Sequence, residues 1–208
     1  MELKQLHTAT QGAHMHRFRD TVEIFRQYAG QYRFDTLLLV AQGYQESNLD
    51  QRTVSRVGAV GLMQIMPQTG RELGVGDVHK ANPNVHAGAK YMAQLIDDYF
   101  SGVQFDDQNR NLFAFAAYNA GPGKIQSLRR EAQTEKLDPN LWFNNVERVA
   151  AARVGQETVR YVRNIYKYYV AYKLIEEADA AKKAAITAAP REPATVGTSA
   201  PAQPAKPH

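Results

Sequence analysis

Residues 34–47 read FDTLLLVAQGYQES, and this stretch decides how the rest of the chain is interpreted. Asp35 is a residue type that caps helices, and the apolar run after it predicts a helix from Thr36 to about Gln45. A carboxylate, Glu46, follows where the apolar run ends. Two interpretations of Glu46 stay open: an ordinary solvated helix end, or an acid placed for chemistry.

Two features of the expected surroundings of Glu46 disfavour its charged form. A helix end directs a partial negative charge at the carboxylate. Apolar neighbours such as Leu38, Leu39 and Tyr44 add desolvation, so the pKa of Glu46 should rise. A carboxylic acid kept protonated near neutral pH can protonate a glycosidic oxygen. Taken alone, however, the stretch favours the solvated helix end.

The other long patterns in the chain also predict helices, with no clear alternation typical of strands. A face of Phe18, Val22, Phe25 and Ala29 predicts a helix that stops at Gly30. Further helices are expected over residues 68–73, 83–100, 109–121 and 156–178, and Gly121 and Pro122 are expected to end the third of these. The fold class is therefore mainly α, with at most a small β-hairpin around residues 50–62.

Composition narrows the classes of function. The chain has 208 residues, 44% hydrophobic and 22% charged, which suits one globular domain. Of the net charge of +4, residues 180–208 carry +3, which leaves about +1 and no Lys/Arg block in the body, so no nucleic-acid partner is expected. The chain has no cysteine, which excludes disulfides, thiolate zinc sites and a cysteine nucleophile.

The chain is expected to divide at residue 178. Residues 1–178 form the predicted folded domain, and residues 179–208 form an Ala/Pro/Lys-rich tail that holds five of the nine prolines. Such a tail cannot bury enough apolar surface to fold, so we expect it to be disordered. It serves as a linker or a wall-facing tether, or it is an extension without a role.

Three further motifs each allow a structural and a functional interpretation. In VGAVGLMQIMPQTG, residues 57–70, the Gln64 amide needs partners from the backbone or from a sugar, and Met63 suits core packing. In AYNAGPG, residues 117–123, Tyr118 and Asn119 could hold a sugar or simply end a helix. In ETVRYV, nothing in the periodicity distinguishes Tyr161 from the packing tyrosines around it.

Together the motifs resemble the soluble-type (family 1) lytic transglycosylases, which cut the glycan strands of bacterial peptidoglycan. The motifs stand as Glu46-Ser47, Gly61-Leu62-Met63-Gln64, Ala117-Tyr118-Asn119-Ala120-Gly121, and Glu157-Thr158 with Tyr161-Val162. The match covers about residues 30–172, and GYQES is most similar to the membrane-bound type F branch. The resemblance implies a lysozyme-like (goose-type-lysozyme-like) fold with a groove for glycan.

The resemblance also implies a reaction without metal or cofactor. Glu46 would protonate the bond between N-acetylmuramic acid and N-acetylglucosamine, then accept a proton from the muramoyl 6-hydroxyl as it closes a 1,6-anhydro ring. A hydrolase normally needs a second carboxylate. Asp50 is nearest in sequence, but we interpret it, like Asn48, as an ordinary loop residue.

The remaining site residues follow from the same resemblance. The substrate-binding set is Ser47, Ser55, Met63, Gln64, Tyr118, Asn119 and Tyr161. Ser47 would bond Glu46 or its helix end, Ser55 would lie near the acetamido pocket, and Tyr161 would place its hydroxyl near Glu46. Val57 departs from the family pattern, because some relatives have a second serine there.

Two rival functions remain. One is a goose-type-like muramidase that uses water, and the other is a peptidoglycan-binding module without turnover. The substrate implies a periplasmic or envelope location, with peripheral or tethered attachment to the envelope. We expect the protein to be a monomer whose partner is the glycan strand. The N-terminus has no apolar signal core, and His7, His14, His16, His79 and His86 show no metal-ligand spacing.

Overall fold

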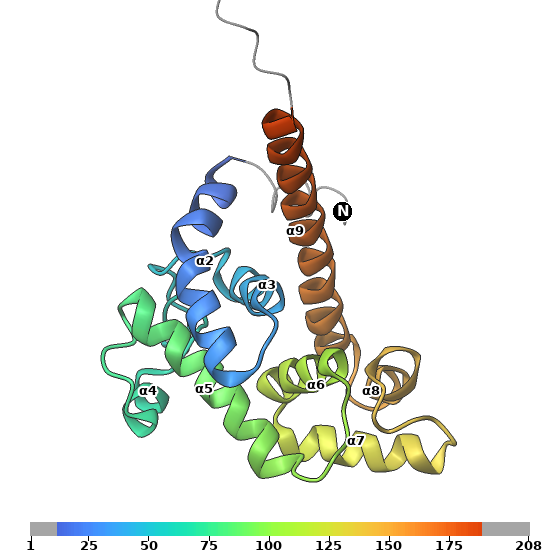
Figure 1. The fold of residues 1–208 in the computed structure, drawn as a ribbon. Helices are drawn as coiled ribbons and strands as arrows, with labels where there is room; N and C mark the ends of the chain where they lie inside the picture. The colour runs from blue at the N-terminus through green and yellow to red at the C-terminus, as the bar shows by residue number, and fades with distance from the viewer. Residues whose placement is uncertain (1–11, 189–208) are drawn as a thin grey trace, which may run out of the picture. The chain divides into compact units, whose positions relative to one another are not determined.

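The computed structural model describes residues 12–188, and helices make up its regular structure there (Figure 1). The helices are α2 (Ala13–Tyr32), α3 (Thr36–Ser47), α4 (Pro67–Leu73), α5 (Ala81–Tyr99), α6 (Asp107–Ala120), α7 (Pro122–Thr134), α8 (Glu147–Arg153) and α9 (Gln156–Ala188). A short turn, η1 (Trp142–Val146), precedes α8 and is interrupted by non-helical backbone at Phe143 and Asn144.

Helix α3 is the buried centre of the body. As predicted, Asp35 caps it: the carboxylate Oδ1 accepts a hydrogen bond from the Leu38 backbone N–H at 2.9 Å. Every residue from Leu37 to Tyr44 is buried. The helix continues past the predicted end to Ser47, which places Glu46 inside its last turn.

Helix α2 packs against α3 and α5, and its predicted apolar face is confirmed, because Phe18, Val22, Phe25 and Ala29 are all buried. The predicted stop at Gly30 is wrong. Gly30 is exposed within the helix, which ends after Tyr32. One glycine in a helix costs about 1 kcal/mol, which packing of the apolar face readily offsets.

Helices α4, α5 and α6 match the patterns that predicted them, and α5 packs against α2, α4 and α6. Helix α7 and the η1–α8 segment were not predicted. Gly121 and Pro122 do end α6, but Pro122 also begins α7, since proline is well suited to the first helical position. Segment 48–66 forms no hairpin of regular strands; it holds only the antiparallel bridges Val54–Val60 and Val60–Ile65.

The first part of α9 joins the body through aromatic rings. Tyr172 stacks on Phe18 of α2 at 4.8 Å between ring centroids, and Tyr168 meets Tyr44 of α3 edge-on at 4.6 Å. The body is one compact unit that ends at Ile175. The second unit starts at Glu176, and there residues 179–188, the start of the predicted tail, are helical.

Residues 189–208, the rest of the predicted tail, lie outside the described residues, as does His7. Within residues 12–188, no helix is both long enough and apolar enough to cross a membrane.

Candidate active site

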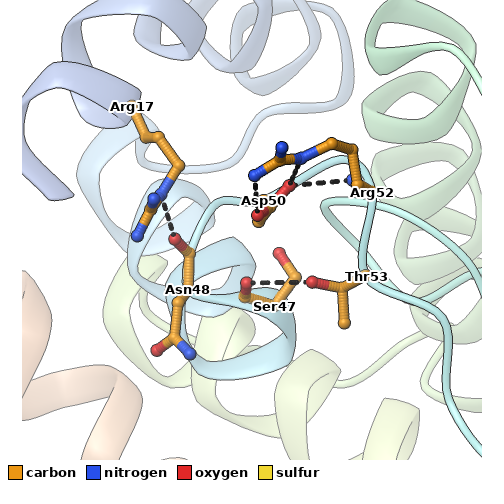
Figure 2. A network of polar contacts seen from close by, with 6 residues as sticks. All are labelled: Arg17, Ser47, Asn48, Asp50, Arg52 and Thr53. Atoms are coloured by element: carbon orange, nitrogen blue, oxygen red, sulfur yellow. Dashed lines mark hydrogen bonds and ion pairs between the residues drawn. The ribbon is translucent and has the colours of Figure 1, made fainter. Parts of the chain in front are cut away.

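The chain leaves α3 through a tightly held turn (Figure 2). Asn48 and Leu49 both adopt left-handed backbone conformations, with φ of 54° and 57°. Arg17 of α2 donates a hydrogen bond from Nε to the Asn48 carbonyl at 2.9 Å, and the Leu49 side chain is buried. These contacts fix the helix end that carries Glu46.

Asp50 is part of this turn. Its carboxylate accepts hydrogen bonds from Nε, Nη2 and the backbone N–H of Arg52, at 3.0, 2.9 and 2.9 Å. These bonds lower the pKa of Asp50 to about 2. The Thr53 hydroxyl, beside them in Figure 2, donates to the Ser47 carbonyl at 3.4 Å. The Asp50 carboxylate is thus engaged within the loop, which agrees with the prediction of an ordinary loop residue.

Glu46 has the properties of a general acid. It lies partly buried in the last turn of α3. Burial is the main influence and raises the pKa of Glu46 to about 7, although a hydrogen bond from Tyr161 acts in the opposite direction. A carboxyl group with this pKa carries its proton at neutral pH often enough to donate it.

The hydroxyl group of Tyr161, on α9, donates a hydrogen bond to Glu46 Oε1. The same hydroxyl oxygen accepts a hydrogen bond from the Gln42 side-chain Nε2 at 3.3 Å. Burial, and then the nearby Glu46 charge, raise the pKa of Tyr161 well above its ordinary value. Tyr161 therefore stays a neutral phenol that can orient the acid, and the structure distinguishes it from its neighbours where periodicity does not.

A pocket of about 390 Å³ opens at Glu46. Its lining residues are Gln45, Glu46, Asn119, Glu157, Arg160, Tyr161 and Asn164. The pocket thus brings together three of the predicted site residues, from α3, α6 and α9. The Thr158 hydroxyl donates to Asn119 Oδ1 at 2.9 Å, which links the end of α6 to the start of α9.

Three other predicted residues are engaged in contacts within the protein. Ser47 is buried, and its hydroxyl bonds the Gly43 and Leu62 carbonyls at 3.1 and 3.0 Å, so it ties its own helix end to the next loop. The Tyr118 hydroxyl donates to the Met63 carbonyl at 2.7 Å, and the Met63 side chain is fully buried. None of these side chains is among the residues that line the pocket.

The last two predicted residues belong to the loop between α3 and α4. The Gln64 amide donates to the Thr53 and Gly61 carbonyls at 3.2 and 2.9 Å. Ser55 Oγ accepts from the Ala59 backbone N–H at 2.9 Å. In this structure both side chains are engaged with the loop itself, and neither is a lining residue of the pocket.

Two residues that sequence reasoning missed hold the site together. Asn84 of α5 accepts from the Met63 N–H and donates to the Val60 and Val78 carbonyls, each at 2.8 Å. Gln42 lies fully buried beside Tyr161. The available signal for Gln42 was a polar side chain within the apolar run LLLVAQGY.

A larger cavity of about 500 Å³ lies near the other end of α3, where Asp35, Leu38 and Tyr169 contribute to its lining. Asp35 and Glu46 are at opposite ends of the helix, about 16 Å apart along its axis. The larger cavity is therefore separate from the pocket at Glu46.

Across residues 12–188, no group of three or more His, Asp or Glu side chains is arranged to hold a metal ion.

Comparison with known proteins gives consistent matches. The profile of the family described as "Transglycosylase SLT domain" matches residues 23–141. The chain is 33% identical over 161 residues to membrane-bound lytic murein transglycosylase F of Ectopseudomonas mendocina (strain ymp), covering 71% of this chain and 32% of that protein. The protein of the same name from Desulfosudis oleivorans is 34% identical over 166 residues, covering 74% and 36%. The chain thus spans about a third of the length of these curated relatives.

Two solved structures are similar in fold and sequence. An inactive mutant of lytic transglycosylase Slt from Pseudomonas aeruginosa aligns with a TM-score of 0.56 and 25% identity, over 77% of this chain and 24% of that one. The 70 kDa soluble lytic transglycosylase from Escherichia coli aligns with a TM-score of 0.53 and 25% identity, over 74% and 24%.

Proposed function

This chain belongs to the transglycosylase SLT domain family, and on that premise we propose that it acts as a peptidoglycan lytic transglycosylase. Its substrate is the glycan strand of peptidoglycan. The bond it cleaves joins N-acetylmuramic acid to N-acetylglucosamine, and the product carries a 1,6-anhydromuramoyl end.

One observation carries the proposal: Glu46 combines a pKa raised to about 7 with a position in the lining of an open pocket. In its protonated form Glu46 gives its proton to the glycosidic oxygen as the C1–O bond breaks. The muramoyl 6-hydroxyl then bonds to C1, and the Glu46 carboxylate takes the hydroxyl proton. Glu46 ends the cycle protonated, so one residue acts as acid and then as base.

The muramidase alternative has one observation in its favour. Glu157 also lines the pocket, and a hydrolase needs a second carboxylate to activate water. Glu157 is exposed at the start of α9, whereas Glu46 is partly buried. We propose that Glu157 does not take part in bond cleavage, so Glu157→Gln should leave the mass of the products unchanged.

The other predicted site residues are proposed either to contact the glycan directly or to support the residues that do. Asn119 and Tyr161, as pocket-lining residues, contact the sugar at the cleaved bond. Ser47, Met63 and Tyr118 support these residues indirectly, through the hydrogen bonds that join α3 and α6 to the loop after α3. Ser55 and Gln64 contact glycan further along the groove. No metal or cofactor takes part.

The proposed setting follows from the substrate. The names of the relatives describe membrane-bound murein enzymes. We propose that this chain works in the periplasm or cell envelope as a monomer bound to glycan strands, peripherally attached or tethered.

Glu46→Gln tests the proposal by removing the proton donor while keeping the shape of the side chain. We expect release of soluble fragments from purified sacculi to fall at least about 100-fold, the usual contribution of a general acid. Asp50→Asn is the matched control, because its carboxylate is engaged with Arg52, and it should retain release. A Glu46→Gln variant with full activity would refute the assignment.

A further inference from the structure

Gln42 and Glu46 lie one turn apart on α3, and positions separated by four residues share a helix face. Tyr161 of α9 reaches both side chains. Its hydroxyl oxygen accepts a hydrogen bond from Gln42 Nε2 at 3.3 Å, and its hydroxyl group donates a hydrogen bond to Glu46 Oε1. The three side chains thus form one row of hydrogen bonds that runs from the amide to the acid.

The single proton of the Tyr161 hydroxyl determines which group donates and which accepts in these hydrogen bonds. A tyrosine hydroxyl has one proton to donate and two lone pairs that accept. Because the Gln42 N–H group occupies a lone pair, the single proton of Tyr161 is free to point at Glu46. A hydroxyl that accepts one hydrogen bond also becomes a stronger donor in the next.

The buried side chain of Gln42 has a cost in folding free energy. Its side chain is fully buried, and within the described residues its Oε1 atom has no hydrogen-bond partner. A buried acceptor without a partner costs free energy, and an apolar side chain would avoid that cost. A purely structural role therefore does not explain the amide, whereas its nitrogen has a definite use at Tyr161.

We propose that Gln42 is a positioning residue whose side-chain amide orients the Tyr161 hydroxyl toward Glu46. This role rests on the proposed function, since it prepares Glu46 to act first as acid and then as base. Gln42 touches neither the sugar nor the reacting proton and acts through Tyr161.

The proposal predicts a direction for the titration of Glu46. Without the amide, Tyr161 stabilises ionised Glu46 less well, so the pKa of Glu46 should rise further above about 7. The other groups that face Glu46 are Tyr118 of α6 and, in the pocket, Glu157 and Arg160 of α9. A change at Gln42 leaves their charges as they are.

The test is a carbon-13 NMR titration of the Glu46 side-chain carboxyl in the full chain, assigned with the Glu46→Gln spectrum. Gln42→Met keeps the length of the side chain and removes the amide. We expect Gln42→Met to raise the pKa of Glu46 by about 0.5 unit. Tyr161→Phe should raise it as well, and the double variant should match Tyr161→Phe alone.

Tyr172→Phe is the control for the loss of a buried polar group, since the Tyr172 hydroxyl is buried and unpaired among the described residues and lies about 16 Å along α9 from Tyr161. It should leave the titration of Glu46 unchanged. Gln42→Leu serves as a second variant, and thermal unfolding of each variant verifies that it folds.

An unchanged Glu46 titration in folded Gln42→Met or Gln42→Leu overturns the proposal. A shift that persists at full size in the Tyr161→Phe background overturns it too, because Gln42 would then act without Tyr161. The titration needs no substrate, so it separates this inference from the proposed function. In an active enzyme, the alkaline limb of the kcat/KM profile should move up with the pKa.

Discussion

Glu46 shows how the surroundings of one residue determine its chemistry. Loss of water on burial disfavours its charge and raises the pKa of Glu46 to about 7, even though the hydrogen bond from Tyr161 lowers it. Asp50, four residues further along, has the opposite surroundings, because Arg52 lowers its pKa to about 2. Of these two neighbouring carboxyl groups, only Glu46 is prepared to donate a proton near neutral pH.

The raised pKa of Glu46 also lowers the stability of the fold at high pH. The unfolded chain releases the Glu46 proton near pH 4.5 and the folded chain near pH 7, so folding stability falls as the pH rises between these values. The Glu46→Gln change removes this loss, because an amide does not titrate. At about 1.4 kcal/mol for each pKa unit, Glu46→Gln should be more stable than the wild type by about 3 kcal/mol at most above pH 7.

Denaturant unfolding at pH 4 and pH 8 measures this difference. The wild type and Glu46→Gln should have similar free energies of unfolding at pH 4, where Glu46 holds its proton in both the folded and the unfolded wild type. An advantage of equal size at both pH values would mean that the effect comes from packing rather than from proton release.

At the scale of elements, the loop between α3 and α4 holds the site in place. Asn84 and Gln51 bind its backbone, and at Gly61 the backbone has φ of 77°. A Cβ atom at Gly61 would lie 2.4 Å from Gln51 Nε2 and 2.5 Å from Asn84 Nδ2. Gly61 is therefore needed both for its conformation and for the space that it leaves.

Gly61→Ala should lower the free energy of unfolding by more than the conformational strain alone, which is about 1–2 kcal/mol. Gly58→Ala is the matched control: Gly58 has φ of 87°, but no atom lies within 4 Å of the added Cβ. Denaturant unfolding compares the two. Equal losses would show that the close approach to Gln51 and Asn84 has no energetic effect.

The elements also show which features sequence patterns reveal. Helices with one apolar face, such as α2 and α5, were predicted, because hydrophobic periodicity directly reports a buried stripe. Helix α7 was missed because Pro122 was interpreted only as the end of α6. Segment η1–α8 was missed because non-helical backbone at Asn144, which no local pattern indicates, interrupts it.

For the site, the sequence motifs predicted a set of residues but not which of them line the pocket. Glu46, Asn119 and Tyr161 meet at one pocket, whereas Ser47 and Gln64 hold backbone carbonyls. The difference depends on how α3, α6 and α9 approach one another, which is a tertiary property. The pairing of Gln42 with Tyr161 could not be predicted for the same reason, since the two residues are far apart in the sequence.

At the scale of the whole molecule, the predicted mainly α, lysozyme-like class is confirmed by the helical structure and by the similarity to the two solved transglycosylases. The body ends as a compact unit at Ile175, and the side chains of residues 176–187 are all exposed. The site residues all belong to the body, so the body should be sufficient for folding and catalysis.

A chain that ends at Ile175 should therefore unfold at the same temperature as the full chain, to within about 2 °C, because exposed residues contribute little to stability. It should also release soluble fragments from sacculi at the same rate. If only the rate fell, residues 176–208 would contribute to binding of the wall; if the unfolding temperature fell, they would support the body.

The mass of the muropeptides released from purified sacculi tests the central claim most directly. If Glu46 acts as acid and then as base on the muramoyl 6-hydroxyl, the new muramoyl ends are 1,6-anhydro sugars, lighter by one water molecule than reducing ends. Glu157→Gln should give these same ends, and Glu46→Gln should give almost none. Reducing ends from the wild-type protein would contradict the account and identify a hydrolase.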